Sequence, residues 1–143
     1  MQIIKNKQLI ENHWTYLEDD APVVSGNICV SLARWQKEKE VLSKHAGNLG
    51  VRLYCTDDIA SLGSDLGLFA LIELYFEDFM DGRNFTQAYL LRNRYGFQGE
   101  IRAVGNYLAD QAFQLSRVGV NAFAPAKLEQ TFATLDDFTV FYQ

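Results

Sequence analysis

Beyond position 50, apolar and polar residues alternate first with the period of a β-strand and then with that of a helix, several times over. In positions 51–55, Arg52 and Tyr54 fall on the side opposite to the apolar residues. Positions 69–76 are almost continuously apolar, which is typical of a strand covered on both faces. The pattern also predicts two later strands, at 100–104 and 121–124.

Helical periodicity lies between these strands and predicts three helices, at 58–66, 85–95 and 106–118. Asp57 or Asp58 is the expected N-cap of the first helix, and Asn106 that of the third. Gly96 is expected to end the second in the left-handed conformation. Because strand and helix alternate, we expect a parallel sheet with right-handed crossovers. A final helix or turn is expected at 127–135.

The first 20 residues are different, because short apolar runs flank a polar turn and predict a β-ribbon that continues through Trp14 and Tyr16. A strand-like alternation near 28–32 then changes to a helix that ends near Ser43. Trp35, Val41 and Leu42 are expected near its buried face.

Together these patterns predict a single domain over 1–143, with the ribbon at 1–20 and an α/β core at 28–143. The expected core is an open, mostly parallel sheet of about four to five strands with helices on both faces. The chain is too short for a complete eight-stranded (β/α) barrel, which takes roughly 250 residues. A half-barrel-like (β/α) curl is the alternative.

The charge and composition of the chain exclude several classes of function. The chain carries a net charge of −5, which argues against general nucleic-acid binding and against binding to anionic membranes. Polar residues interrupt positions 1–17, so they do not form a signal peptide, and no apolar run could span a bilayer. We therefore expect a cytoplasmic protein. Cys29 and Cys55 are far apart and are expected to be buried thiols.

Arginines mark the expected functional edge. Ligands of open parallel sheets gather beyond the carboxyl ends of the strands, where the loop with Gly82 and Arg83 should lie. Helix starts near Phe85 and Asn106 would open onto the same edge and favour anions. We predict an anion site formed by Gly82, Arg83, Asn106 and Arg102, with Asp81, Phe85, Asp110 and Gln111 in support.

Structural roles for the same residues stay open. Asp81 could only cap its loop and pair with Arg83. Arg102 lies inside an expected strand, where a buried guanidinium needs a partner. Glu73, Asp78 or Asp110 could supply its carboxylate.

No motif for a cofactor is present: no Gly-x-Gly-x-x-Gly follows a strand and there is no P-loop, so no bound cofactor is expected. The acidic residues near Asp78 are expected to be solvated rather than to bind a metal. His13 and His45 lie outside the expected edge, and the sequence identifies no catalytic residue.

One long ordered run of motifs extends over residues 69–123. Its pieces are an apolar strand, Asp81-Gly-Arg-Asn-Phe-Thr-Gln-Ala, Leu91-Arg, Tyr95-Gly-Phe-Gln-Gly, Arg102-Ala-Val-Gly and Asp110-Gln. In this order they resemble the signature of the bacterial DUF934 family. Asn84 stands where the family usually has glycine, and Val118 where it usually has cysteine, so a cysteine there is not required in this chain.

The resemblance implies a place in sulfite reduction, because the family is labelled a probable oxidoreductase of that pathway. Two hypotheses follow. The first is an accessory protein that docks to assimilatory sulfite reductase and aids its assembly, electron supply or sulfite supply. The second is a small oxidoreductase or oxyanion-binding enzyme whose arginine-lined site holds an anion such as sulfite.

Overall fold

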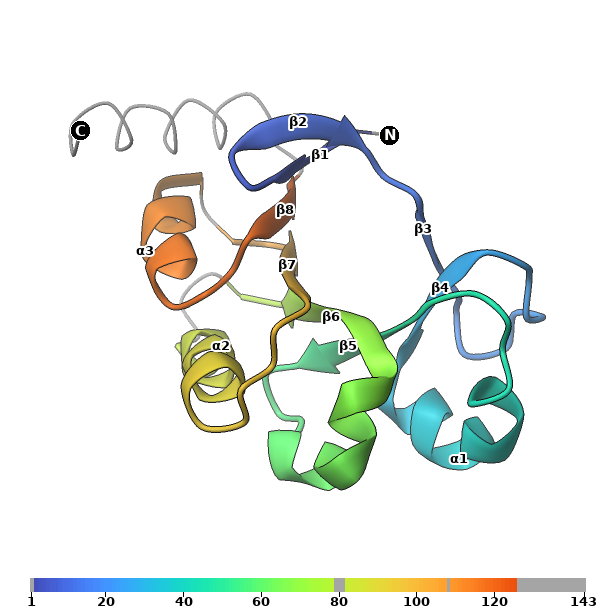
Figure 1. Cartoon of the computed structure of the whole chain (residues 1–143). Helices are drawn as coiled ribbons and strands as arrows, with labels where there is room; N and C mark the ends of the chain where they lie inside the picture. The colour runs from blue at the N-terminus through green and yellow to red at the C-terminus, as the bar shows by residue number, and fades with distance from the viewer. Residues whose placement is uncertain (1, 79–81, 108, 126–143) are drawn as a thin grey trace.

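A computed structural model describes residues 2–78, 82–107 and 109–125 (Figure 1). Eight strands form one sheet in the order β2-β1-β8-β7-β6-β5-β4-β3. Strands β3 to β8 run parallel, whereas β1 is antiparallel to both β2 and β8. The strands are β1 Gln2–Lys5, β2 Gln8–Glu11, β3 Trp14–Tyr16, β4 Asn27–Ser31, β5 Leu49–Tyr54, β6 Phe69–Phe76, β7 Glu100–Gly105 and β8 Ala122–Pro125.

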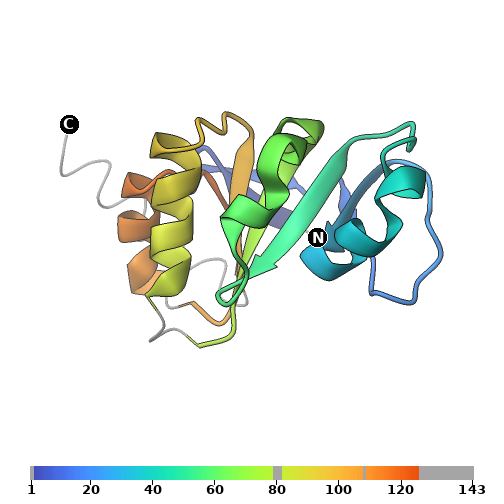
Figure 2. The ribbon, with the colours of Figure 1, turned by 90° about the horizontal axis from the view of Figure 1, so that it is seen from below.

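The described helices lie along the outer face of this curled sheet (Figures 1 and 2). The fold is therefore α/β and has the half-barrel-like curl. It has eight strands rather than four to five, and the described helices lie on one face of the sheet rather than on both. The helices are α1 Leu32–Leu42, α2 Arg83–Asn93 and α3 Ala112–Arg117, with the 3₁₀ helices η1 Ile59–Leu68 and η2 Ala109–Gln111.

The curl follows from one short connection. Strands β2 and β3 are the two ends of the sheet order, yet only Asn12 and His13 link them. In a flat sheet, seven spacings would put these strands about 33 Å apart. The three Cα–Cα steps from Glu11 to Trp14 can span only about 11 Å. The sheet therefore has to bend until its two ends approach each other.

The expected ribbon is accordingly only partly right. The hairpin of β1 and β2 forms, but β3 leaves it and pairs in parallel with β4 at the other end of the sheet. The extra strands arise because both parts of the ribbon extend the sheet instead of standing beside it. The alternation of apolar and polar residues predicts that a segment is a strand, but it does not predict which strand pairs with it.

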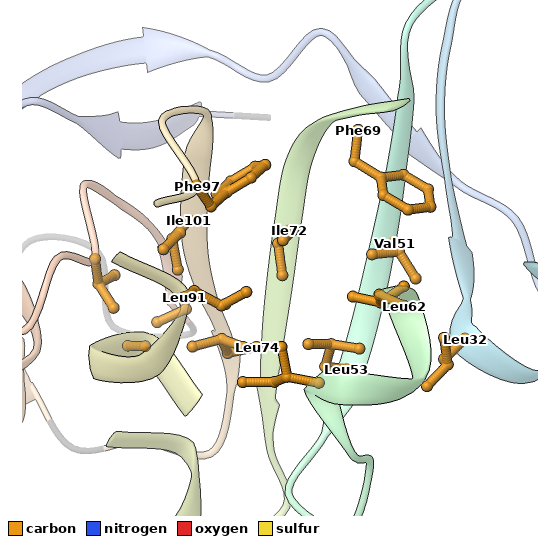
Figure 3. Packing of buried hydrophobic residues seen from close by; sticks show 14 of the residues in the cluster. Leu32, Val51, Leu53, Leu62, Phe69, Ile72, Leu74, Leu91, Phe97 and Ile101 are labelled. Atoms are coloured by element: carbon orange, nitrogen blue, oxygen red, sulfur yellow. The ribbon is translucent and has the colours of Figure 1, made fainter. Parts of the chain in front are cut away.

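The main core lies between the sheet and the outer helices. Figure 3 shows Val51, Ile72 and Ile101 from three strands gathered with Leu62 of η1 and Leu91 of α2. All five are at most 2% exposed, and each such side chain contributes about 1.5–3 kcal/mol when fully buried. Alternation along each strand then turns its other residues toward the concave inner face.

Most expected helix boundaries are close to the observed ones. Ser31 Oγ accepts from Arg34 N at 3.1 Å at the start of α1, and Asp58 Oδ1 accepts from Ala60 N at 3.0 Å before η1. Gly96 has the expected left-handed conformation, with φ of 66°. Val41, by contrast, is 67% exposed, so its expected place on the buried face is wrong.

The N-cap prediction for Asn106 is also wrong. The α3 helix begins later, and Gln111 occupies its N-cap position. Asn106 instead extends the end of the sheet, because its backbone N–H donates to Phe76 O at 2.7 Å and its side chain donates to Glu77 O at 3.2 Å. The expected helix at 127–135 lies outside the described residues.

Candidate functional site

The start of α2 lies at the carboxyl edge of the sheet, as the sequence predicted. Gly82 occupies the N-cap position without a side-chain cap, and its carbonyl accepts from Phe85 N at 3.1 Å. Arg83 is exposed as the first residue of the helix. Asn106, also exposed, reaches the same edge through its bonds to the end of β6. Asp81 lies outside the described residues.

Two buried amides tie the first turn of α2 to the strand ends. Asn84 Nδ2 donates to Tyr75 O at 3.3 Å and to Gln87 Oε1 at 3.1 Å. Gln87 Nε2 donates to Tyr54 O at 2.9 Å and to Asp57 O at 3.1 Å. Asn84 thus has a structural use for its side chain at the position where the family signature usually has glycine.

The supporting residues have different surroundings. Phe85 is half-buried and packs edge-on against Phe76 with ring centroids 6.1 Å apart, so it extends the core. Asp110 is exposed in η2, and Gln111 is half-buried before α3. Phe85 therefore holds α2 against the sheet, while Asp110 and Gln111 belong to the start of the next helix.

Arg102 does not join the exposed edge. It is 1% exposed on the inner face of β7, where its Nη2 lies 2.7 Å from Glu100 Oε2 and its Nε donates to the same oxygen at 2.8 Å. Its Nη1 lies 3.8 Å from Glu73 Oε2 and donates to Asn12 Oδ1 at 3.0 Å. The arginine is thus part of a buried ion-pair network. Positions two apart in a strand share a face, and this rule could have identified Glu100 as a partner.

Opposite charges alternate across the inner face. Arg52, Glu73 and Arg102 are register neighbours on three adjacent strands. Arg52 Nε donates to Glu73 Oε1 at 2.9 Å, and Lys5 Nζ lies 3.2 Å from Glu100 Oε1. We call these five residues the inner-face network. Each buried carboxylate has a cationic neighbour, which is the condition for burying it at tolerable cost.

Cys29 lies beside this network, where its Sγ donates to Glu73 Oε1 at 3.5 Å. Burial, together with the negative charge of Glu73, raises the pKa of the Cys29 thiol well above its usual range. The thiol therefore stays protonated and is a poor nucleophile.

Tyrosines surround Arg52, a residue to which the sequence assigned no role. The Arg52 Cζ lies 3.6 Å from the centroid of the Tyr16 ring and 5.2 Å from that of Tyr75. Tyr54 and Tyr75 are also neighbours, with centroids 5.2 Å apart. Burial lowers the pKa of Arg52, but the Glu73 carboxylate outweighs this and the net pKa is raised. Arg52 is thus a fully charged group held in an aromatic frame.

A pocket of about 430 Å³ opens at the other edge of the sheet, near the amino ends of the strands. Arg92 supports its loop, since Nη1 donates to Phe97 O and Gly99 O, both at 2.8 Å. Burial lowers the pKa of this guanidinium. The described lining consists of Gly63, Ser64, Leu66, Gly67, Phe69, Tyr95, Gly96, Phe97, Gln98 and Gly99.

Among the described residues, no group of three or more His, Cys, Asp or Glu side chains could hold a metal ion. Within the same residues, no helix has both the length and the apolar character needed to cross a membrane.

Comparison with known proteins gives one match. A family model described as "Bacterial protein of unknown function (DUF934)" matches residues 50–143, which begin in β5 and include α2 and the pocket loop. The searches of curated proteins and of solved structures found no match. Because this match covers more than half of the chain, the chain belongs to the DUF934 family.

Proposed function

We propose that this protein is an accessory protein of assimilatory sulfite reduction that docks to sulfite reductase through the pocket between η1 and the end of α2. The link to the pathway comes from the family resemblance. The choice of a binding role over a catalytic one comes from the chemistry of the pocket.

The observation that carries the proposal is the composition of the pocket wall. Its described lining combines backbone and apolar groups with the polar side chains of Ser64, Gln98 and Tyr95, and it includes no Asp, Glu, His, Lys or Arg. Such a wall can accept an apolar side chain and make hydrogen bonds, which suits recognition better than proton transfer.

The rim of the pocket supports a protein as the ligand. Tyr95 is 36% exposed, and Leu68, adjacent to the lining residue Gly67, is 52% exposed. Tyrosine is enriched at protein interfaces because it combines a large apolar ring with a polar end. Arg94 lies over the Tyr95 ring, with its Cζ 5.9 Å from the centroid, and adds a cation to this rim.

Affinity capture from cells grown on sulfate tests the proposal. The tagged protein should recover sulfite reductase, and Tyr95→Ala should reduce the recovery at least about tenfold, a typical loss for an interface anchor. Tyr89→Ala is the matched control, because Tyr89 is 54% exposed on α2 but is not among the described lining residues. Failure to recover sulfite reductase, or equal recovery with Tyr95→Ala, would contradict the proposal.

The second candidate function is a small oxidoreductase or oxyanion-binding enzyme at the carboxyl edge. The exposed Arg83 and Asn106 at that edge favour it. An absorption spectrum of the purified protein separates the two functions, since a bound flavin would support the enzyme and contradict the accessory role.

A further inference from the structure

The guanidinium of Arg52 is held in place on two sides. The Tyr16 ring covers one face, with its centroid 3.6 Å from Arg52 Cζ, and Arg52 Nε donates to Glu73 Oε1 at 2.9 Å. With Nε bonded, the N–H donors that remain are those of the outer edge, on Nη1 and Nη2. This edge presents paired N–H donors in the geometry that matches two oxygens of one anion.

That outer edge has no partner in the part of the chain that the structure describes. Arg52 donates one hydrogen bond there, from Nε. Its side chain is 16% exposed, and neither of its terminal nitrogens is among the buried atoms that lack a hydrogen bond. The two terminal nitrogens are therefore within reach of solvent. Arg102 differs, because all three of its nitrogens have acceptors.

Three tyrosine rings lie around the guanidinium. The pKa of Tyr16 is raised above its usual range. Burial is the largest cause, and a hydrogen bond and charge repulsion with Tyr54 add to it. The Tyr16 hydroxyl therefore keeps its proton at neutral pH. Tyr54 and Tyr75 occupy the next inward-facing register position after Arg52 and Glu73, nearer the carboxyl edge, and both are half-buried.

We propose that Arg52 forms a small-oxyanion site at the carboxyl mouth of the curled sheet, on its inner face. Nη1 and Nη2 bind two oxygens of a sulfate, sulfite, phosphate or carboxylate group, and the tyrosine hydroxyls border the site. Glu73 neutralises the Nε side and keeps the fork in position. The site is separate from Arg83, which lies on α2, and it does not depend on the proposed docking to sulfite reductase.

Isothermal titration calorimetry with sulfate, sulfite, phosphate and acetate, at constant ionic strength set with chloride, tests this site. The unmodified protein should bind at least one of these anions saturably. Arg52→Lys keeps the charge beside Glu73 but lacks the fork, and should weaken binding at least about tenfold, the loss expected for a charged hydrogen bond. Arg117→Gln, at an exposed arginine of α3, is the control and should bind normally. Arg83→Gln distinguishes this site from the second candidate site at the start of α2.

Three outcomes overturn the proposal: no saturable binding by the unmodified protein, normal binding by Arg52→Lys, or loss of binding in Arg83→Gln alone. If Arg52→Lys fails to fold, arginine-selective NMR of the unmodified protein decides instead. Addition of sulfate should then shift the Arg52 Nε signal and leave that of Arg102 unchanged, and an unshifted Arg52 signal contradicts the site. Sulfite reductase capture without anion binding would refute this site alone.

Discussion

Asn12 Oδ1 accepts a hydrogen bond of 3.0 Å from Arg102 Nη1 and so joins the connection between the two ends of the sheet to its centre. The same oxygen accepts from Trp14 N at 3.0 Å, where β3 begins. One side chain thus fixes the course of the short linker and satisfies a buried cation.

We expect Asn12→Ala to lower the free energy of unfolding by about 1–3 kcal/mol, because a charged donor of Arg102 loses its acceptor. Urea denaturation measures this. Gln8→Ala, at an exposed position of β2, serves as the control and should change stability by less than about 0.5 kcal/mol. Equal effects of the two variants would show that the bond contributes nothing.

Replacement of Arg102 should cost much more. Arg102→Met removes the cation nearest to Glu100 Oε2, and the Glu100 side chain is only 7% exposed. The loss should destabilise the protein by about 3–5 kcal/mol. Arg94→Met makes the same change at an exposed arginine and should have little effect on stability. The two denaturation midpoints compare them, and a midpoint for Arg102→Met close to that of the unmodified protein would be inconsistent with the network.

The Cys29 thiol should be protected by burial. In a Cys55→Ser variant, Cys29 is the one remaining cysteine, and its thiol is fully buried with a raised pKa. Its reaction with an aromatic disulfide should be at least about a thousandfold slower in the native state than in urea, since it requires unfolding. Fast native reaction would contradict the packing of Cys29 against Glu73.

The Asp65 carboxylate should make the free energy of unfolding depend on pH. A hydrogen bond from Lys39, at 2.5 Å, lowers the pKa of this carboxyl below its usual value of about 3.9. Because the pKa of Asp65 is lower in the folded state, its carboxylate stabilises the folded protein fully at pH values above the unfolded-state pKa. This stabilisation is lost as the pH falls through the folded-state pKa. Asp65→Asn should therefore cost about 0.5–1 kcal/mol at pH 7 and less as pH falls below 4. A difference that stays constant down to pH 2 would oppose this.

Gly105 should not tolerate a side chain. Its φ is 89°, and an added Cβ would lie 2.6 Å from Phe76 O. Gly105→Ala should cost at least about 2 kcal/mol, since the left-handed strain alone is about 1–2 kcal/mol. Gly67→Ala is the matched control, because nothing lies within 4 Å of its added Cβ. Thermal melting of both variants distinguishes backbone constraint from a general effect of glycine replacement.

The sequence by itself determined the elements whose evidence is local. Strand β6 has the predicted limits, α2 and β7 begin and end within two residues of theirs, and Gly96 has the expected left-handed conformation. These features depend on periodicity, caps and backbone freedom, which nearby residues decide. The family followed from an ordered motif of the same local kind.

Only the tertiary structure decided which distant residues meet. Local pattern could not show that β2 and β3 would become opposite ends of one sheet, or that their two-residue link would force it to curl. For the same reason Arg102, expected at an anion site, lies in the inner-face network, while the outer edge of Arg52 has no partner among the described residues. Strand order and charge pairing depend on contacts between positions as far apart as Asn12 and Arg102, and no local pattern encodes them.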